Sequence, residues 1–399
     1  MDPATLRELL DVILRWTHLI AGIMWIGNSL LFNWLDRNLV RDPGGDARHL
    51  GRIWLLHSGG FYDVEKKFLA PSELPATLHW FKWQSYTTWL TGLSLLILLY
   101  WSGGATLMID PGVMRLSSGQ ALAVGVGVVF GGFALYDVIW RALGKLEVLA
   151  TALSLACLAG IVWGLTHALS GRAAFIHVGA LLGTVMSGNV LHTIVPSQRK
   201  LVAATQAGKA QDPALSAHAK QRSIHNNYLT FPLLFTMLSN HFAAITGSKV
   251  SFLLLGIFFV GGALARHILN VRATLGAWVP ALTATLLGTL AAVAVVLART
   301  APAPVALDPG APPVTLAQVQ FIAQTRCTPC HSDAPSLVSN PPAPAGVRFG
   351  TAEELAMWRE RIQARVVVGR TMPLNNRTGM TEEERGVIAR WVVQGKPAG

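Results

Sequence analysis

Long apolar stretches recur along the first three quarters of the chain, and shorter polar segments separate them. Eight of these stretches approach the roughly 20 residues that a helix needs to cross a bilayer. Glycines four residues apart, such as Gly179 and Gly183, suit close packing of such helices. The pattern predicts an all-α, polytopic membrane domain of about eight transmembrane helices, over residues 9–34, 83–101, 119–140, 146–168, 173–195, 226–247, 250–270 and 275–298.

The apolar pattern ends at Arg299, and a different kind of chain follows. Residues 300–313 contain five prolines, which favour an extended and semi-rigid segment. Residues beyond this segment mix apolar and polar positions at helical spacing. We therefore expect three parts: a membrane domain over residues 1–299, a linker over 300–313 and a C-terminal domain over 314–399.

Composition and charge narrow the class of protein. Hydrophobic residues make up 52% of the 399 residues and charged residues only 13%, which excludes a disordered chain and favours a bilayer as the surroundings. Alternate loops hold fifteen lysines and arginines against four in the opposite loops, so the positive-inside rule places both termini outside the cytoplasm. The first apolar run lacks the small-residue cleavage site of a secretory signal peptide, so we expect it to remain in the mature protein. We attribute the excess of lysine and arginine to the membrane topology of the loops, and we expect no nucleic-acid partner.

Two of the three cysteines share one short motif, and three are too few for a disulfide framework. Cys327, Cys330 and His331 form Cys-x-x-Cys-His, in which the thiols can form thioethers with haem vinyl groups while the imidazole binds the iron. A zinc ribbon would need a second pair of ligands, and a thioredoxin-type site would need a surrounding βαβ pattern. The motif therefore predicts a covalent haem c, whereas Cys157 lies in an apolar stretch and should belong to the core.

The second axial ligand of that iron should lie downstream of the motif. Met372 stands directly before a proline, and a thioether ligand there would keep the iron low-spin and raise its potential. Two other methionines compete: Met357 lies within a helical pattern, and Met380 precedes an acidic helix start. We predict His331 and Met372 as the iron ligands, in a domain that looks like a small class I cytochrome c and closes with a helix over 381–394.

The membrane domain carries histidines that could bind a second haem. His177 and His192, 15 residues apart, differ by about 60° around a helix and by roughly 22 Å along it, so one helix could serve two stacked haems. His225 and His241 differ by about 160° and cannot face the same partner. For each of these histidines a hydrogen-bonded structural role is the alternative. The candidate ligands of a membrane haem b are His18, His177, His192 and His241.

The long segment between the first two predicted helices combines glycines, aromatic residues, a histidine and lysines. Such a set could hold a flat anionic heterocycle by stacking and by charge. The alternative is an interfacial aromatic belt whose lysines reach lipid head groups. If this segment is a site, its candidate catalytic residues are Arg52, His57, Glu65 and Lys66, which the sequence does not rank.

Three of these segments, taken with the order of the helices, resemble a known family. Residues 16–29, 57–62 and 79–83, followed by the further apolar helices and a fused Cys-x-x-Cys-His domain, are similar to the membrane-bound bacterial urate oxidases, or urate hydroxylases. The likeness covers essentially the whole chain. It implies oxidation of urate to 5-hydroxyisourate at the bacterial inner membrane, with the cytochrome c domain in the periplasm passing electrons to a respiratory acceptor.

Two other classes of function fit the same pattern. The first is an electron-transfer subunit with haems b and c that carries electrons from quinol or a partner dehydrogenase and has no substrate chemistry of its own. The second is a transporter fused to a redox sensor, which the polar residues within the helices permit. Reduction of the haem by urate alone would separate the enzyme from both alternatives.

Overall fold

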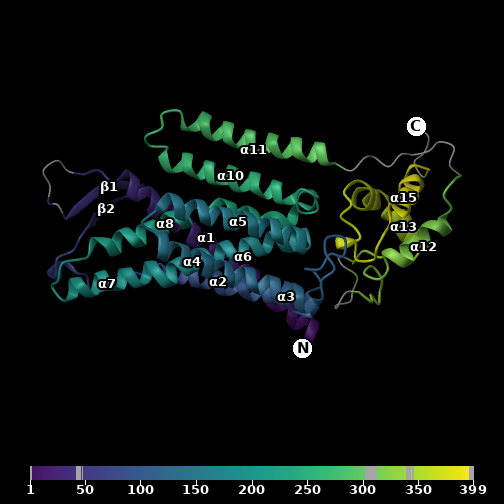
Figure 1. Ribbon diagram of the computed structural model, residues 1–399, viewed down its shortest axis with the longest axis horizontal. Coiled ribbons are helices and arrows are strands. Elements are labelled where there is room, and N and C mark those ends of the chain that lie inside the picture. The colour runs from purple at the N-terminus through teal and green to yellow at the C-terminus, as the bar shows by residue number, and fades with distance from the viewer. Residues whose placement is uncertain are drawn as a thin grey trace.

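The structure, a computed structural model, describes residues 2–41, 46, 48–301, 312–337, 343 and 346–394. Its largest part is a bundle of long helices, with a two-stranded hairpin extending from one end and a smaller helical region beyond the other end (Figure 1). Most of the predicted linker, residues 302–311, lies outside the described residues.

Helices occupy all eight of the predicted apolar stretches. Single π-helical turns extend α2 to Trp101, join α3 to α4 and join α6 to α7. The bundle consists of α1 (Pro3–Asn38), α2 (Lys82–Leu96), α3 (Ser118–Val126), α4 (Gly132–Leu143), α5 (Glu147–Ala168), α6 (Gly171–Asn189), α7 (Val195–Gln206), α8 (Pro213–Leu238), α9 (Ala243–Thr246), α10 (Ser251–Val271) and α11 (Trp278–Thr300).

Within the described residues, six helical spans are long and apolar enough to cross a membrane, two fewer than predicted. The two exceptions are α2, which has 15 residues before its π-helical turn, and α8. Polar residues of α8 such as Arg222 and Asn227 lower its hydropathy, and they are almost fully buried against neighbouring helices. The six spans are compatible with a multi-pass membrane protein: Thr5–Asn38, Ser118–Leu143, Glu147–Ala168, Gly171–Gln206, Ser251–Val271 and Trp278–Thr300.

The central helix of the bundle is α6, which packs against α2, α5 and α8. Its buried Phe175 and Val178 belong to the main hydrophobic core. A Cβ atom at Gly179 would lie 2.4 Å from the hydroxyl oxygen of Thr236 on α8, whereas one at Gly183 would meet nothing within 4 Å. The predicted close approach of helices therefore holds at Gly179 and not at Gly183.

The prediction of an all-α chain was wrong for the segment between α1 and α2. Strands β1 (His49–His57) and β2 (Gly60–Lys67) form an antiparallel hairpin in which His57 pairs with Gly60. Ser58 and Gly59 both have positive φ, which gives the two-residue turn that matches the twist of a hairpin. Both faces of the hairpin carry large apolar side chains, so the sequence lacks the clear alternation that would have predicted strands.

The C-terminal region has a hydrophobic core of its own. It contains α12 (Leu316–Arg326), α13 (Ala352–Met357), α14 (Arg359–Ile362), which a π-helical turn extends to Val368, and α15 (Glu382–Gln394). Its core includes Val319, Leu355 and Trp391 and contains no residue of the bundle. Its last helix, α15, lies where the sequence predicted a closing helix.

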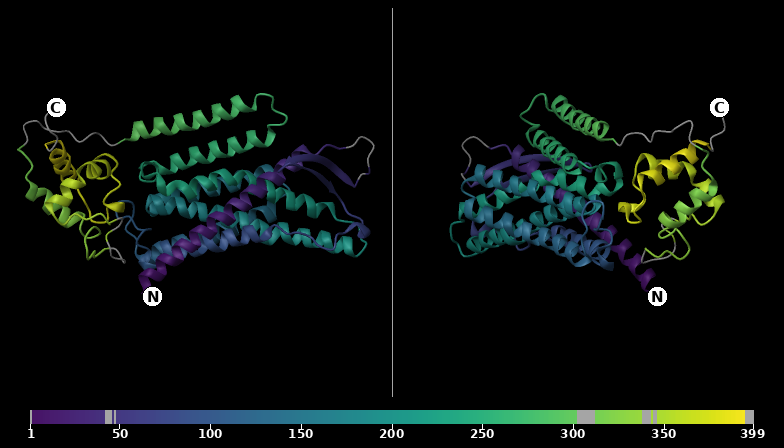
Figure 2. Two further views of the ribbon diagram at one scale, coloured as in Figure 1. Left: turned by 180° about the vertical axis from the view of Figure 1, so that it is seen from behind. Right: turned by 45° about the vertical axis from the view of Figure 1, so that its right-hand side comes forward.

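The two ends of the bundle differ in what they carry. The hairpin and the connections α7–α8 and α10–α11 lie at one end, whereas the start of α1 and the C-terminal region lie at the other (Figures 1 and 2). The Asn375 side chain of the C-terminal region donates to the Leu107 carbonyl in the loop before α3, over 3.4 Å. We call these the hairpin end and the C-terminal end.

Candidate functional site

The Cys-x-x-Cys-His motif folds as one tight turn directly after α12. The backbone N–H groups of Cys330 and His331 both donate to the Cys327 carbonyl, over 3.1 and 2.9 Å. Because this turn is closed by its own backbone, the two thiols and the imidazole are brought together at the end of one helix. Local sequence alone therefore builds this part of the site.

The His331 imidazole is oriented as a metal ligand should be. Its Nδ1 lies 2.9 Å from the Val347 carbonyl, and since a carbonyl only accepts, Nδ1 carries the hydrogen. In the neutral ring, Nε2 then keeps its lone pair. A backbone carbonyl on the far ring nitrogen is the usual support of a metal-bound histidine. Phe349 packs its ring against His331, with centroids 5.2 Å apart.

Both cysteines of the motif are free thiols in the described structure. Burial raises the pKa of the Cys327 thiol to about 12, and it also raises the pKa of Cys330. Neither thiol is therefore a thiolate at neutral pH, which disfavours thiol–disulfide exchange. Among the described residues no group of three histidine, cysteine or acidic side chains could hold a metal ion by itself.

The structure separates the three methionines that the sequence offered as the second ligand. Met357 is 74% exposed, and Met380 is buried within the C-terminal core. Met372 packs partly buried against that same core, as does Cys327. Its backbone is fixed from two sides, because its carbonyl accepts from Arg385 over 2.9 Å and its N–H donates to Arg365. The cysteines, His331 and Met372 thus fit the donor set of a c-type haem.

The four histidines proposed to bind a membrane haem b are spread through the bundle. The Nδ1 atom of His18 on α1 bonds to the Thr88 carbonyl at 2.9 Å, and Nε2 of the fully buried His177 accepts from Trp101 at 2.9 Å. Thr88 and Trp101 are 13 residues apart on one helix, or about 20 Å, so His18 and His177 cannot share one iron. His192 and His241 are exposed.

The described ring contacts join none of these histidines to another, and the ring of His177 is already enclosed. A Cβ atom at Gly125 would lie 2.7 Å from its Nε2, which leaves no space for a porphyrin there. His225, the other histidine considered, bonds to the Tyr136 hydroxyl over 2.7 Å and packs on Trp140. As arranged, these side chains do not fit a haem b, which stays a prediction.

The four catalytic candidates between α1 and α2 all lie on the hairpin and are exposed. Arg52 and Glu65 face each other across the strands, but His57 is five residues further along, or about 17 Å, at the tip. Each side chain also has a partner nearby: Asp63 for Arg52, His49 for Glu65, Asp36 for Lys66 and Ser58 for His57. The hairpin thus brings two of them together and does not gather all four.

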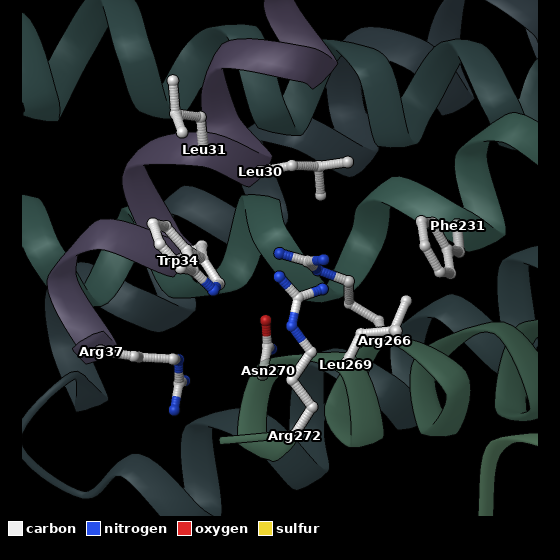
Figure 3. Close-up of a pocket in the computed structure, with 9 residues that line it drawn as sticks. All are labelled: Leu30, Leu31, Trp34, Arg37, Phe231, Arg266, Leu269, Asn270 and Arg272. Carbon is white, nitrogen blue, oxygen red and sulfur yellow. The ribbon is translucent and has the colours of Figure 1, made fainter. Parts of the chain in front are cut away.

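A cavity of about 270 Å³ lies at the hairpin end, between α1, α8 and α10. Figure 3 shows the guanidinium groups of Arg266 and Arg272 meeting in its middle, with Trp34 and Arg37 of α1 facing them and Phe231 of α8 at the side. Its described lining contains no acidic residue; it consists of Leu30, Leu31, Trp34, Arg37, Phe231, Arg266, Leu269, Asn270 and Arg272.

Two asparagines hold the inner wall of this cavity in place. Asn227 of α8 accepts from the side chain of Arg266 and donates to the side-chain oxygen of Asn270, over 3.1 Å in the second bond. Arg266 and Asn270 are only 6% and 8% exposed, whereas Arg37 and Arg272 are exposed at the mouth. The amide nitrogen of Asn270 is buried and has no hydrogen-bond partner within the described part of the chain.

The sequence did not predict this cavity, because its residues come from three parts of the chain separated by up to 242 positions. A signal was nevertheless present: Arg266 and Asn270 are polar residues four apart, with His267 between them, near the end of a mostly apolar helix, where polar side chains are costly and usually functional. The side chains near residue 34 could not be paired with them without the fold.

Comparison with known proteins matches the bundle to a family. A family model described as the N-terminal part of urate oxidase matches residues 4–298, which include the whole bundle apart from Pro3 at the start of α1 and the last two residues of α11. No curated protein and no solved structure matches the chain.

Proposed function

The chain belongs to the urate oxidase N-terminal family, and we propose that its membrane domain oxidises urate to 5-hydroxyisourate and passes the electrons to a haem c in the C-terminal region. From there the electrons leave to a respiratory acceptor. With urate and its product counted in the same ionic form, the reaction consumes one urate and one water and releases two protons and two electrons. A protein that catalyses this reaction needs a binding site for a planar anion and an electron acceptor.

The turn Cys327–His331 is the observation that carries this proposal. Its free thiols, the orientation of its imidazole, and Met372, which packs against the same hydrophobic core as Cys327, support a covalently attached haem. Such a haem would supply a one-electron acceptor, so each urate requires two transfers. His331 and Met372 would hold the iron, and Arg365 and Arg385 would keep the backbone of Met372 in place.

Anaerobic addition of urate to the purified, oxidised protein tests the proposal. We expect the absorption of a reduced c-type haem to appear without any partner protein or quinol, with two haems reduced per urate consumed. A spectrum that changes only with quinol would support the electron-transfer subunit and contradict the enzyme. Uptake of urate into vesicles with no haem reduction would support the transporter.

The number and type of haems can be counted on the same sample. A pyridine haemochrome spectrum separates haem c from haem b, and the iron content gives the haems per chain. One iron per chain with only c-type bands would remove the predicted haem b. A b-type band would mean that histidines of the bundle rearrange when the cofactor enters.

A further inference from the structure

We propose that the cavity between α1, α8 and α10 is the place where the urate anion binds, with Arg266 and Asn270 as its inner contacts. This inference rests on the proposed function and names the site for its substrate. It assigns binding to helix residues at the hairpin end, apart from the four hairpin side chains that the sequence offered as catalytic.

The positive charge of the cavity favours an anionic ligand. Three guanidinium groups line it, and those of Arg266 and Arg272 meet in its middle (Figure 3). None of the three forms an ion pair with an acidic residue in the part of the chain that the structure describes. A buried cation without a counter-ion is costly, so a bound anion would relieve both its desolvation and the mutual repulsion.

The donors of the cavity match a flat heterocycle with carbonyl groups at its edge. A guanidinium group presents several N–H donors in one plane, which suits a carbonyl oxygen beside a deprotonated ring nitrogen. The partnerless amide nitrogen of Asn270 supplies one more donor, because its oxygen is already held by Asn227. A buried donor without an acceptor is destabilising, and a purine carbonyl could provide that acceptor.

The walls of the cavity suit an aromatic ring. Trp34 and Phe231 lie on either side of the arginines in Figure 3, and leucines of α1 and α10 complete the lining. The volume of 270 Å³ is slightly below the range of about 300–1,000 Å³ that drug-sized ligands occupy, which fits a small bicyclic molecule.

An anionic lipid head group is the other ligand that arginines at a helix end could attract. The exposed Arg37 and Arg272 would be sufficient for a phosphate at the surface. A lipid would not use the buried Arg266, the partnerless Asn270 or the aromatic walls, since a phosphate group has no ring to stack. The depth of the cavity therefore favours the planar anion.

Binding can be measured without turnover if the full-length protein is first fully reduced, because urate then has no electron acceptor. Equilibrium dialysis of the reduced protein with labelled urate gives the dissociation constant. We expect Arg266→Gln to raise it about ten- to a hundredfold, the range for a hydrogen bond to a charged group, and Arg37→Gln to raise it about three- to tenfold. Arg141→Gln is the matched control, because Arg141 lies at the same end on α4, is 65% exposed and does not line the cavity.

The outcomes separate the two proposals. If the wild-type protein neither binds urate nor is reduced by it, the proposed function fails. If it does both, and Arg37→Gln and Arg266→Gln bind urate as tightly as Arg141→Gln does, the function stands and the cavity is the wrong site. If the two variants lose affinity for phosphatidylglycerol vesicles and keep their affinity for urate, the cavity is a lipid site. Arg37 is exposed, so its variant still tests the cavity if the buried Arg266→Gln variant does not fold.

Discussion

The haem motif and the arginine cavity are assembled in opposite ways. The motif takes its thiols and imidazole from one turn of five residues, closed by hydrogen bonds within its own backbone. The cavity takes its groups from α1, α8 and α10, and only the packing of these helices holds the groups together. Each site offers an atom that a ligand would use: Nε2 of His331, whose other ring nitrogen is held by a carbonyl, and the amide nitrogen of Asn270, which has no hydrogen-bond partner among the described residues.

This contrast predicts how each site responds to change. In a site formed by one turn, removing one side chain should leave the other side chains in their positions. A site made by helix packing should respond to substitutions far from it, because moving one helix moves a whole wall. The four predictions that follow use this difference.

The largest effect is expected from Cys330→Ala. The turn at His331 is closed by backbone bonds and should persist, so haem would still bind but through a single thioether to Cys327. A haem stain after denaturing electrophoresis and a shifted pyridine haemochrome band would record the change. The dissociation constant for urate should stay at its wild-type value, and a change there would contradict the independence of the two sites.

Next in size is Met372→Ala, which should lower the haem potential and slow urate-driven reduction while leaving the haem attached. Loss of a thioether ligand removes the group that stabilises the reduced iron. A redox titration followed by the absorption band measures the potential. Met357→Ala is the control, since this side chain is 74% exposed and should leave the potential unchanged. An unchanged potential in the Met372 variant would mean that another side chain is the ligand.

A helix-packing substitution should disturb the cavity and spare the motif. Gly179→Ala places a methyl group 2.4 Å from Thr236 on α8, the helix that carries Phe231 and Asn227, and overpacking of this kind costs about 1–3 kcal/mol. We expect a lower thermal midpoint and weaker urate binding with a normal haem spectrum. Gly183→Ala, on the same helix with open space around it, should change neither.

The smallest effect is expected when the pH is lowered and the ion pair of the hairpin is weakened. Hydrogen bonds from Arg52 hold the pKa of Asp63 below its ordinary value of 3.8. A lowered pKa in the folded state stabilises the hairpin fully above about pH 4, and this contribution fades as the pH falls through the lowered pKa. Fluorescence of Trp54, which lies beside Arg52, should therefore stay constant from neutral pH to about pH 5 and change only in stronger acid. Asp63→Asn should abolish that acid-dependent step.

The parts of the molecule that depend on local sequence could be predicted, and those that depend on packing could not. Apolar length predicted the helices, and motif spacing predicted the turn at Cys327 because neighbouring residues determine both. The hairpin was missed since Trp54 and Leu56 are exposed on one face and Tyr62 on the other, which hides the alternation of a half-buried strand.

The histidines of the bundle show the limit most clearly. Helical spacing correctly gives the angle and height of one residue against another on the same helix. It cannot say which helices become neighbours, and that choice decides whether His18 and His177 face one iron. For the same reason, the sequence could not show that Arg37 and Arg266, which are 229 positions apart in the chain, line one cavity.

The cavity and the haem motif lie at opposite ends of the bundle, and this separation gives the proposed reaction an electrical direction. With the basic hairpin end in the cytoplasm, as the loop charges predict, each urate would send two electrons outward and release two protons inside. Moving one elementary charge through the membrane potential is worth about 2.3 kcal/mol per 100 mV, or about 4.6 kcal/mol for the pair. With the cytoplasmic side negative, urate oxidation would then be more favourable in an energised cell and would discharge part of the voltage that drives it.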